Sequence, residues 1–307
     1  MTAASAQIKA TYPDSYYAAS AHPAPERPAF EGDLAPEVCI IGGGFTGLSA
    51  ALELAEKGHR VGLLEGARIG WGASGRNGGQ IVNGLNASLE TITKRYGSQT
   101  AGFVGTVVQE GGAIIRERVA RYAIDCDLKD GNLFTVFSDK DLAELETRRK
   151  LWQSHGHDNF EMLDRAGVRA HVRSDAYAGG MFDRTGGHMH PLNLALGQAA
   201  AFESLGGVIH EHSEVTAIED VAGQPVVRTA RGTIRPEALI LGGNAYLGHL
   251  VPELENRIMP FSTQMIATEP LGDRGDALLP TDTCVEDVRY VLDYYRLSAD
   301  GRLLFGG

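Results

Sequence analysis

The fold is decided by the stretch VCIIGGGFTG, residues 38–47, in which a short apolar run leads into three consecutive glycines. Four adjacent apolar residues are typical of a buried parallel strand. Apolar side chains then recur at helical spacing from Phe45 to Ala55, and Gly58 is placed to end the helix. A second apolar strand is predicted over 60–65. This succession of strand, glycine turn, helix and strand predicts a βαβ unit.

The glycines form the pattern Gly42-x-Gly44-x-x-Gly47 where the strand passes into the helix. The first glycine allows a tight turn, the second lets a pyrophosphate approach the backbone, and the third lets helix and strand pack closely. The phosphates then meet free N–H groups at the helix N-terminus. Glu65 ends the second strand, where its carboxylate can accept hydrogen bonds from a ribose diol and would repel a 2′-phosphate. The pattern therefore predicts a dinucleotide site rather than a structural glycine turn, and it disfavours NADP.

A second glycine-rich loop, GWGASGRNGGQ at 70–80, follows the Glu65 strand. A plain NAD-binding unit passes directly into its next helix at this point. Bare backbone, one arginine and small polar side chains suit the wrapping of a longer cofactor. We therefore expect FAD rather than NAD. The alternative is a flexible surface loop, because glycine alone also gives flexibility.

Composition narrows the class of protein. The 307 residues carry 39 acidic and 28 basic side chains, a formal charge of −11. A surface that negative repels phosphate backbones and anionic lipids, so we expect neither nucleic acid nor a membrane surface as partner. No apolar run reaches the length of a membrane span, and the first thirty residues lack the apolar core of a secretory signal. These features predict a cytoplasmic protein.

The fold class predicted is α/β, with a Rossmann-like FAD-binding domain and an inserted α+β substrate domain built on a mainly antiparallel sheet. The expected boundaries are an N-terminal arm at 1–35, the FAD-binding domain at 36–84 and 188–258, and the substrate domain at 85–187 and 259–307. Prolines make the arm extended. Its adjacent tyrosines, Tyr16 and Tyr17, are suited to anchor it on the protein surface.

Other elements are predicted from local patterns. They are a helix over 139–153 with an aspartate cap, a helix from Pro191 to Leu205, a strand over 208–218, a hairpin over 226–234 and a buried strand over 238–241.

These residues resemble the D-amino-acid-oxidase-type FAD-dependent oxidoreductases. The likeness is carried by Ile41–Gly47, Leu64-Glu65 and the 70–80 loop, and it extends through Gly187–Leu192, Val215, Leu239–Gly243 and Tyr294–Gly307. Within the family, the loop and the Ser15-Tyr16-Tyr17 arm are similar to the γ-glutamylputrescine oxidoreductase branch. The resemblance implies that the second loop lies along the pyrophosphate and flavin, that the Val215 backbone meets the adenine, and that Gly242-Gly243 passes close to the cofactor. The expected cofactor contacts are Gly42, Gly44, Phe45, Thr46, Gly47, Glu65, Ser74, Arg76, Asn77, Gly78, Gly79, Gln80, Val215, Gly242 and Gly243.

Metal binding and disulfide formation are not expected. The three His-x-His pairs, at 155/157, 188/190 and 210/212, have no third ligand at a recognisable spacing. The three cysteines are far apart and odd in number. His188 and His190 lie near the expected junction of the two domains, where they could contact substrate, but the sequence favours a solvated loop at this position.

No nucleophile motif of the Ser, Cys or paired-carboxylate type is present. Flavin chemistry does not need one, because the isoalloxazine accepts the hydride. Tyr294 and Arg296 lie on one face of a late strand, either packing a sheet or facing the flavin or a substrate carboxylate, for which an arginine fork is suited. In sarcosine-oxidase relatives a lysine on the next strand promotes the reaction with oxygen. Leu304 stands at that place here, which leaves the electron acceptor open.

The resulting hypothesis is FAD-dependent oxidation of a primary amine, in an acyl-diamine such as γ-glutamylputrescine, to an aldehyde. One alternative is oxidation of glycine, sarcosine or a D-amino acid, and another is an FAD-binding remnant without turnover. An apolar strand is predicted over 302–305, and only Gly306 and Gly307 follow it. We therefore expect a truncated chain whose exposed sheet edge favours self-association.

Overall fold

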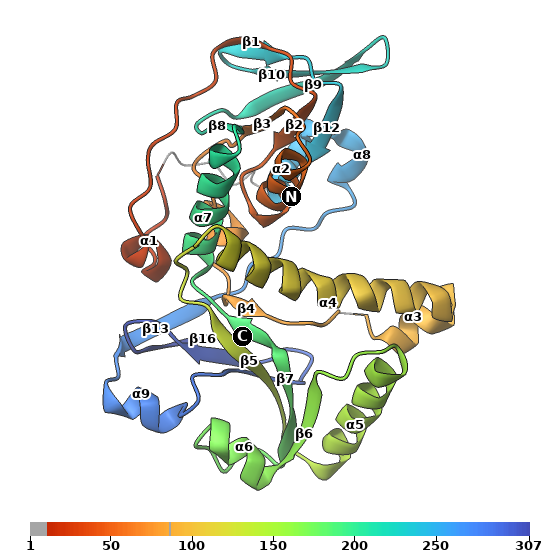
Figure 1. Cartoon of the computed structure of the whole chain (residues 1–307), viewed down its shortest axis with the longest axis vertical. Coiled ribbons are helices and arrows are strands. Elements are labelled where there is room, and N and C mark those ends of the chain that lie inside the picture. The colour runs from red at the N-terminus through yellow and green to blue at the C-terminus, as the bar shows by residue number, and fades with distance from the viewer. Residues whose placement is uncertain (1–10, 86) are drawn as a thin grey trace. The chain divides into compact units, whose positions relative to one another are not determined.

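The computed structural model describes residues 11–85 and 87–307, which form two compact units (Figure 1). The first unit contains the described residues up to Asn77, together with Ile124–Cys126 and Pro191–Ser262. The second unit contains the described residues of Gly78–Ala123, Asp127–His190 and Thr263–Gly307. The first boundary therefore falls before 78–84, a stretch that the sequence assigned to the FAD-binding domain, because strand β4 (Gln80–Ile81) pairs with a strand of the second unit.

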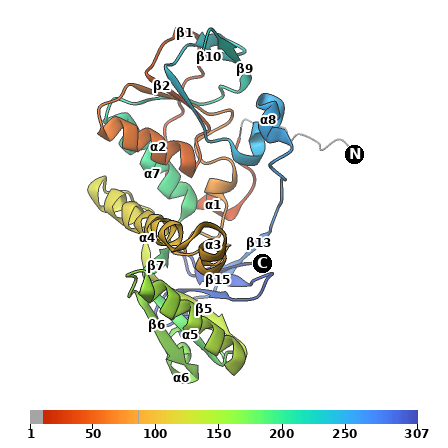
Figure 2. The ribbon, with the colours of Figure 1, turned by 90° about the vertical axis from the view of Figure 1, so that its right-hand side faces the viewer.

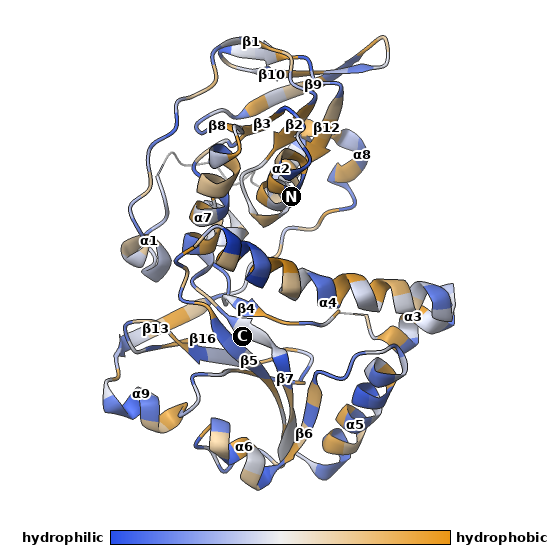
Figure 3. Cartoon of the chain, in the orientation of Figure 1, coloured by the Kyte–Doolittle hydropathy of each residue, from blue (hydrophilic) through white to orange (hydrophobic). Residues whose placement is uncertain are grey.

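A four-stranded parallel sheet forms the core of the first unit. Its order is β12 (Ala238–Leu241), β2 (Val38–Ile41), β3 (Val61–Leu64) and β8 (Val208–His210). Helix α2 (Phe45–Glu56) connects β2 to β3 and packs against α7 (Pro191–Ser204), as Figure 2 shows. Strands β2 and β3 are buried throughout, and β2 is strongly apolar in Figure 3. The predicted Rossmann-like βαβ unit is confirmed.

The first unit contains a second four-stranded sheet, and the structure of this unit corrects two of the predictions. The second sheet contains β1 (Gly32–Leu34), β11 (Gly232–Ile234), β10 (Gln224–Thr229) and β9 (Val215–Val221). The stretch 208–218 was expected to be one strand, but it is divided between β8 and β9, which belong to different sheets. His212, at φ +51°, breaks the extended backbone between them. Strand β12, expected to be buried, is half-buried or exposed along its length.

The N-terminal arm packs on the first unit from residue 11 onward, while residues 1–10 of the expected arm lie outside the described residues. Its short helix α1 (Tyr16–Ser20) buries Tyr17, which is 5% exposed. The Arg27 guanidinium donates to Glu203 at 2.7 and 2.8 Å. The Arg27 backbone N–H donates to the fully buried Glu211 carboxylate, which also accepts a hydrogen bond from Ile69 N at 2.8 Å. Glu211 therefore joins the arm to the start of the second glycine loop.

Three short helices complete the first unit. They are η1 (Ala73–Gly75), η2 (Asn244–Leu250) and α8 (Pro252–Glu255).

An eight-stranded, mainly antiparallel sheet organises the second unit. Its order is β13 (Met265–Pro270), β16 (Arg302–Gly306), β15 (Tyr294–Leu297), β14 (Cys284–Asp287), β5 (Lys129–Val136), β7 (Gly179–His188) and β4, with β6 (Phe160–Asp164) also paired to β7. Strand β16 has a partner strand on each side, so β13 forms the edge of this sheet. Self-association through an exposed sheet edge stays a prediction.

Helices cover both faces of this sheet. Phe134 and Met181 face a core formed with α3 (Leu89–Tyr96), α4 (Ser98–Arg121) and α5 (Asp139–Ser154). The opposite face packs against residues in and next to α6 (Arg165–His171) and α9 (Asp273–Leu278). Helix α5 begins after Ser138, whose hydroxyl accepts from Asp141 N, so its cap is a serine rather than the expected aspartate. In the described part of the chain, no helix is long and apolar enough to cross a membrane.

Candidate cofactor site

The glycine motif forms the floor of a pocket in the first unit. Gly42 has φ +107°, a left-handed conformation that favours glycine. A Cβ at Gly42 would lie 2.8 Å from the carbonyl of Gly242, and a Cβ at Gly47 would lie 1.9 Å from the Gly42 oxygen. Only glycine therefore fits at these two positions. Gly47 itself packs the helix against the strand and does not line the pocket.

The N-terminus of α2 opens onto this pocket, which Gly44, Phe45 and Thr46 line. Gly44 caps the helix without any side chain. The hydroxyl of Ser74, from the second glycine loop, accepts a hydrogen bond from Phe45 N at 2.9 Å. The second loop thereby closes over the first, and a helix N-terminus with bare backbone in front of it suits a phosphate group.

Glu65 stands on the pocket wall directly after β3. Its carboxylate accepts from Gly43 N at 2.6 Å and from Ala67 N at 2.8 Å. Burial raises the pKa of Glu65, and these backbone hydrogen bonds only partly oppose that shift. The carboxylate thus holds the glycine turn in place and is also within reach of a ligand in the pocket.

The opposite wall includes both predicted and unpredicted residues. Val215, Gly242 and Gly243 line it, as expected from the resemblance. Several wall residues were not predicted from the sequence, namely Trp71, Ser213, Glu214, Asn244, Tyr246, Leu247 and Leu250. The segment from Asn244 onward follows Gly242-Gly243 directly, which was the one available signal for it.

Arg76 and Asn77 stabilise the second loop from within. The Arg76 guanidinium donates to Gly72 O at 3.2 Å and to the Tyr246 hydroxyl at 3.0 Å, and it stacks on the Trp71 ring. Asn77 Nδ2 donates to two carbonyls of the η1 turn. Neither residue lines the pocket, so their contact with a cofactor remains a prediction.

The other expected site residues belong to the second unit. Gly78, Gly79 and Gln80 lead into its sheet, and His190, Tyr294 and Arg296 lie on or beside that sheet. His190 is buried, which excludes the alternative of a solvated loop. Burial raises the pKa of Tyr294, whose ring would meet a Cβ placed at Gly78.

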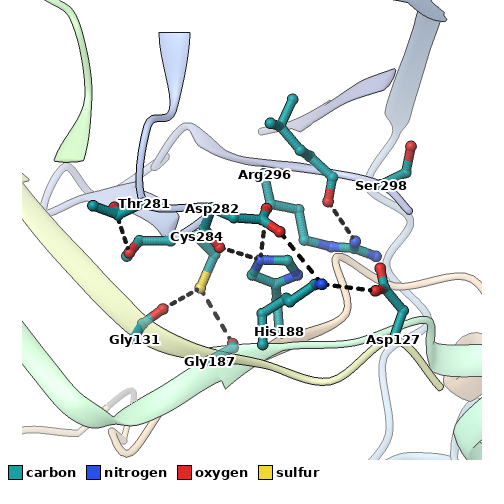
Figure 4. A network of polar contacts seen from close by, with 12 residues as sticks. Asp127, Gly131, Gly187, His188, Thr281, Asp282, Cys284, Arg296 and Ser298 are labelled. Carbon is teal, nitrogen blue, oxygen red and sulfur yellow. Dashed lines mark hydrogen bonds and ion pairs between the residues drawn. The ribbon is translucent and has the colours of Figure 1, made fainter. Parts of the chain in front are cut away.

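Arg296 has partners other than those expected from the sequence. The guanidinium is 2% exposed and donates to the backbone oxygens of Gly78 at 2.7 Å, Met189 at 2.9 Å and Leu297 at 3.0 Å. Figure 4 shows Arg296 beside Ser298. Its donors fix the Gly78-Gly79 turn, and this arrangement does not support a free fork for a substrate carboxylate.

A polar network surrounds Arg296 in Figure 4. His188, 1% exposed, directs Nε2 to the backbone oxygen of Asp282 at 2.7 Å. Lys129 pairs with Asp127 at 3.2 Å, and this carboxylate raises the pKa of Lys129. The Cys284 thiol donates to Asn132 Oδ1 at 2.9 Å, and burial raises its pKa. All three cysteines belong to the described residues, are buried and form no disulfide.

The residues around the first-unit pocket fit the adenosine diphosphate half of FAD. Only glycine fits at Gly42, so no side chain stands between the backbone and a ligand there. The N-terminus of α2, with its free N–H groups, lines the same pocket, and the Glu65 carboxylate can accept hydrogen bonds from ribose hydroxyls. A Cβ at Gly44 would lie 2.8 Å from the Ser74 hydroxyl, so a side chain there would obstruct the cradle.

The chain is similar to known proteins over most of its length. The family model described as FAD dependent oxidoreductase matches residues 37–307. Gamma-glutamylputrescine oxidoreductase of Escherichia coli K12 is 50% identical over 295 residues, which cover 95% of this chain and 69% of that protein. A probable oxidoreductase OrdL of Haemophilus influenzae is 41% identical over 88% of this chain and 64% of its own length. The chain thus spans about two thirds of these relatives.

Solved structures share the fold at low sequence identity. Glycine oxidase from Geobacillus kaustophilus has a TM-score of 0.68 at 21% identity, over 89% of this chain and 70% of that one. L-Amino acid deaminase from Proteus myxofaciens has a TM-score of 0.72 at 18% identity, over 93% and 61%.

Proposed function

Because the chain belongs to the FAD-dependent oxidoreductases, we propose that it oxidises the primary amine of an acyl-diamine of the γ-glutamylputrescine type. FAD, when bound, supplies a hydride acceptor for the carbon next to the amine nitrogen. The resulting imine hydrolyses to an aldehyde and ammonia. The 50% identity to the E. coli gamma-glutamylputrescine oxidoreductase supports this substrate class.

The observation that carries the proposal is the pocket enclosed by two glycine loops in the first unit. The Gly42–Gly47 turn and the start of α2 would hold the pyrophosphate, because they present N–H groups without side chains. Glu65 would accept from the ribose hydroxyls, and Val215 would lie at the adenine. Ser74 keeps the second loop closed through its hydrogen bond to Phe45 N.

The test is anaerobic reduction of the FAD-saturated protein by a panel of amines. We expect γ-glutamylputrescine to bleach the flavin absorbance faster than glycine, sarcosine or D-alanine. γ-Glutamylbutylamide, which lacks the reacting amine, is the matched control and should leave the flavin oxidised. Faster bleaching by glycine or sarcosine would favour the amino-acid oxidase alternative. A flavin that stays oxidised with every amine would indicate a binding remnant without turnover.

A further inference from the structure

One face of the second unit's sheet carries a row of buried polar side chains. Asp183 on β7, Asn132 on β5 and Glu286 on β14 stand on three adjacent strands. The register places Asn132 opposite Asp183, and Glu286 beside Phe134, two residues along β5. Because side chains alternate along a strand, all of them share one face. The other face is apolar around Leu133, so the polar row is confined to the side covered by α3, α4 and α5.

The two carboxylates in this row differ in how fully they are paired. Asp183 accepts from Asn159 Nδ2 at 2.6 Å, from Thr185 N at 2.9 Å and from Asn83 Nδ2 at 2.9 Å. The carboxylate of Glu286, a residue that is 7% exposed, accepts only from Asn132 Nδ2, at 2.9 Å, among the described residues. Burial raises the pKa of Glu286. Asp183 is satisfied by its own unit, whereas Glu286 keeps one carboxylate oxygen for another donor.

Arg148 brings an opposite charge to the same face from helix α5. Its guanidinium lies over the Phe134 ring, 5.0 Å from the centroid, next to Glu286 in the register. It makes no hydrogen bond and no ion pair within 11–85 and 87–307, so its nitrogens are more than 4.0 Å from the Glu286 oxygens. Its neighbour Arg149, in contrast, forms two hydrogen bonds to Glu146. Burial lowers the pKa of Arg148, and the charge of Glu286 opposes that shift.

Arg148 is half-buried, so a ligand can reach its guanidinium, which offers five N–H donors. A ligand that carries both an anionic and a cationic group would complete this separated pair. We propose that Arg148 and Glu286 bind an α-amino-acid zwitterion, with the ligand carboxylate on the Arg148 fork and the ligand ammonium on Glu286. An Arg–carboxylate contact is favourable and specific in this geometry.

This assignment rests on the proposed function and deepens it. A γ-glutamyl amine carries such a zwitterion at the end remote from the amine that reacts. An unmodified diamine has no anionic group for Arg148, and a plain carboxylic acid would be repelled by Glu286. The separated charges therefore favour binding of the γ-glutamyl amine over an unmodified diamine and over a plain carboxylic acid.

Calorimetric titration of the FAD-saturated protein with γ-glutamylbutylamide tests the assignment, because this probe keeps the zwitterion and cannot be oxidised at the missing amine. Arg148→Met and Glu286→Gln should each weaken binding by about tenfold or more, since each removes a charge-assisted contact. Arg149→Met, on the same helix, is the control and should bind like the wild type. Melting temperature and FAD content verify that each variant is folded, and Arg148→Lys, which keeps the charge without the fork, should fall between wild type and Arg148→Met.

A second probe separates recognition from a general loss of structure. 4-Aminobutyryl-butylamide lacks only the carboxylate. We expect the wild-type protein to bind 4-aminobutyryl-butylamide as weakly as the Arg148→Met variant binds γ-glutamylbutylamide. The Arg148→Met substitution should not weaken the binding of 4-aminobutyryl-butylamide further. Equal wild-type affinity for the two probes, or unchanged binding by Arg148→Met, would overturn the assignment. Carboxylate-dependent binding without any turnover of γ-glutamylputrescine would instead contradict only the proposed oxidation.

Discussion

Replacing Glu65 by alanine should destabilise the protein before any cofactor binds. The carboxylate accepts hydrogen bonds from Gly43 N at 2.6 Å and Ala67 N at 2.8 Å, one on each oxygen. A hydrogen bond to a charged group contributes about 1.5–3 kcal/mol, so losing both lowers the free energy of unfolding by roughly 3–6 kcal/mol at most. Water enters the half-buried site and recovers part of this. The second effect is on FAD, whose affinity should fall by about tenfold or more when the ribose hydroxyls lose their acceptor.

The chain allows the two effects of Glu65→Ala to be measured separately. It contains two tryptophans, Trp71 in the first unit and Trp152 in the second. In a Trp152→Phe background, Trp71 fluorescence follows urea unfolding of the first unit without FAD. Flavin fluorescence titration of the same protein then gives the FAD affinity. Glu214→Ala is the matched control, because Glu214 lines the same pocket, is exposed and makes no hydrogen bond within the described residues.

Two results would refute this reasoning about Glu65. An unchanged urea midpoint would mean that the two backbone hydrogen bonds contribute nothing to the apoprotein. An unchanged FAD affinity, with a lowered midpoint, would mean that the ribose is bound elsewhere. A loss of the same size in Glu214→Ala would show that the effect follows from removing any negative charge at the pocket.

Three further outcomes are expected. Because burial raises the pKa of Glu65 and its charged form accepts from the ribose, FAD affinity should begin to fall on acidification at a pH above the usual glutamate range. Glu65→Gln should flatten that titration profile, and a flat wild-type profile would contradict the assignment. Arg27→Met removes one of the two guanidinium groups beside the buried Glu211 carboxylate and leaves Arg68 at 3.7 Å, so thermal melts should show a loss of at most about 3–5 kcal/mol. Gly47→Ala, whose Cβ would meet Gly42 O at 1.9 Å, should abolish FAD binding in a flavin titration. Gly111→Ala in α4, where nothing lies within 4 Å, should retain it.

The sequence predicted the parts of the site that depend on local pattern. The strand, glycine turn and helix around Gly42–Gly47 follow from residues adjacent in the chain, and so does the position of Glu65 at a strand end. Helix α7 likewise begins at Pro191 and stops before Gly206, which has φ +85°. Such features need no knowledge of distant contacts.

Features that depend on distant partners could not be predicted in the same way. The Tyr246 hydroxyl meets Arg76 across 170 residues, and no motif marks that tyrosine. The Arg296 guanidinium was expected to be available for a substrate carboxylate, because the neighbouring sequence does not show that the carbonyls of Gly78 and Met189 accept its hydrogen bonds. The break between β8 and β9 was missed because the alternation of side chains continues through His212, whose backbone turns at positive φ.

The buried carboxylate of Glu211 has a consequence for the order of events during synthesis. It joins backbone N–H groups of Arg27 and Ile69 that lie 184 and 142 residues earlier in the chain. Neither the arm nor the loop after Ile69 can reach its final hydrogen bonds until Glu211 has left the ribosome, and contacts of such long sequence separation form slowly. Nascent chains shorter than this also lack β12, the strand that pairs with β2 in the finished sheet. FAD binding is therefore expected late in synthesis, and the incomplete chain is expected to bind chaperones.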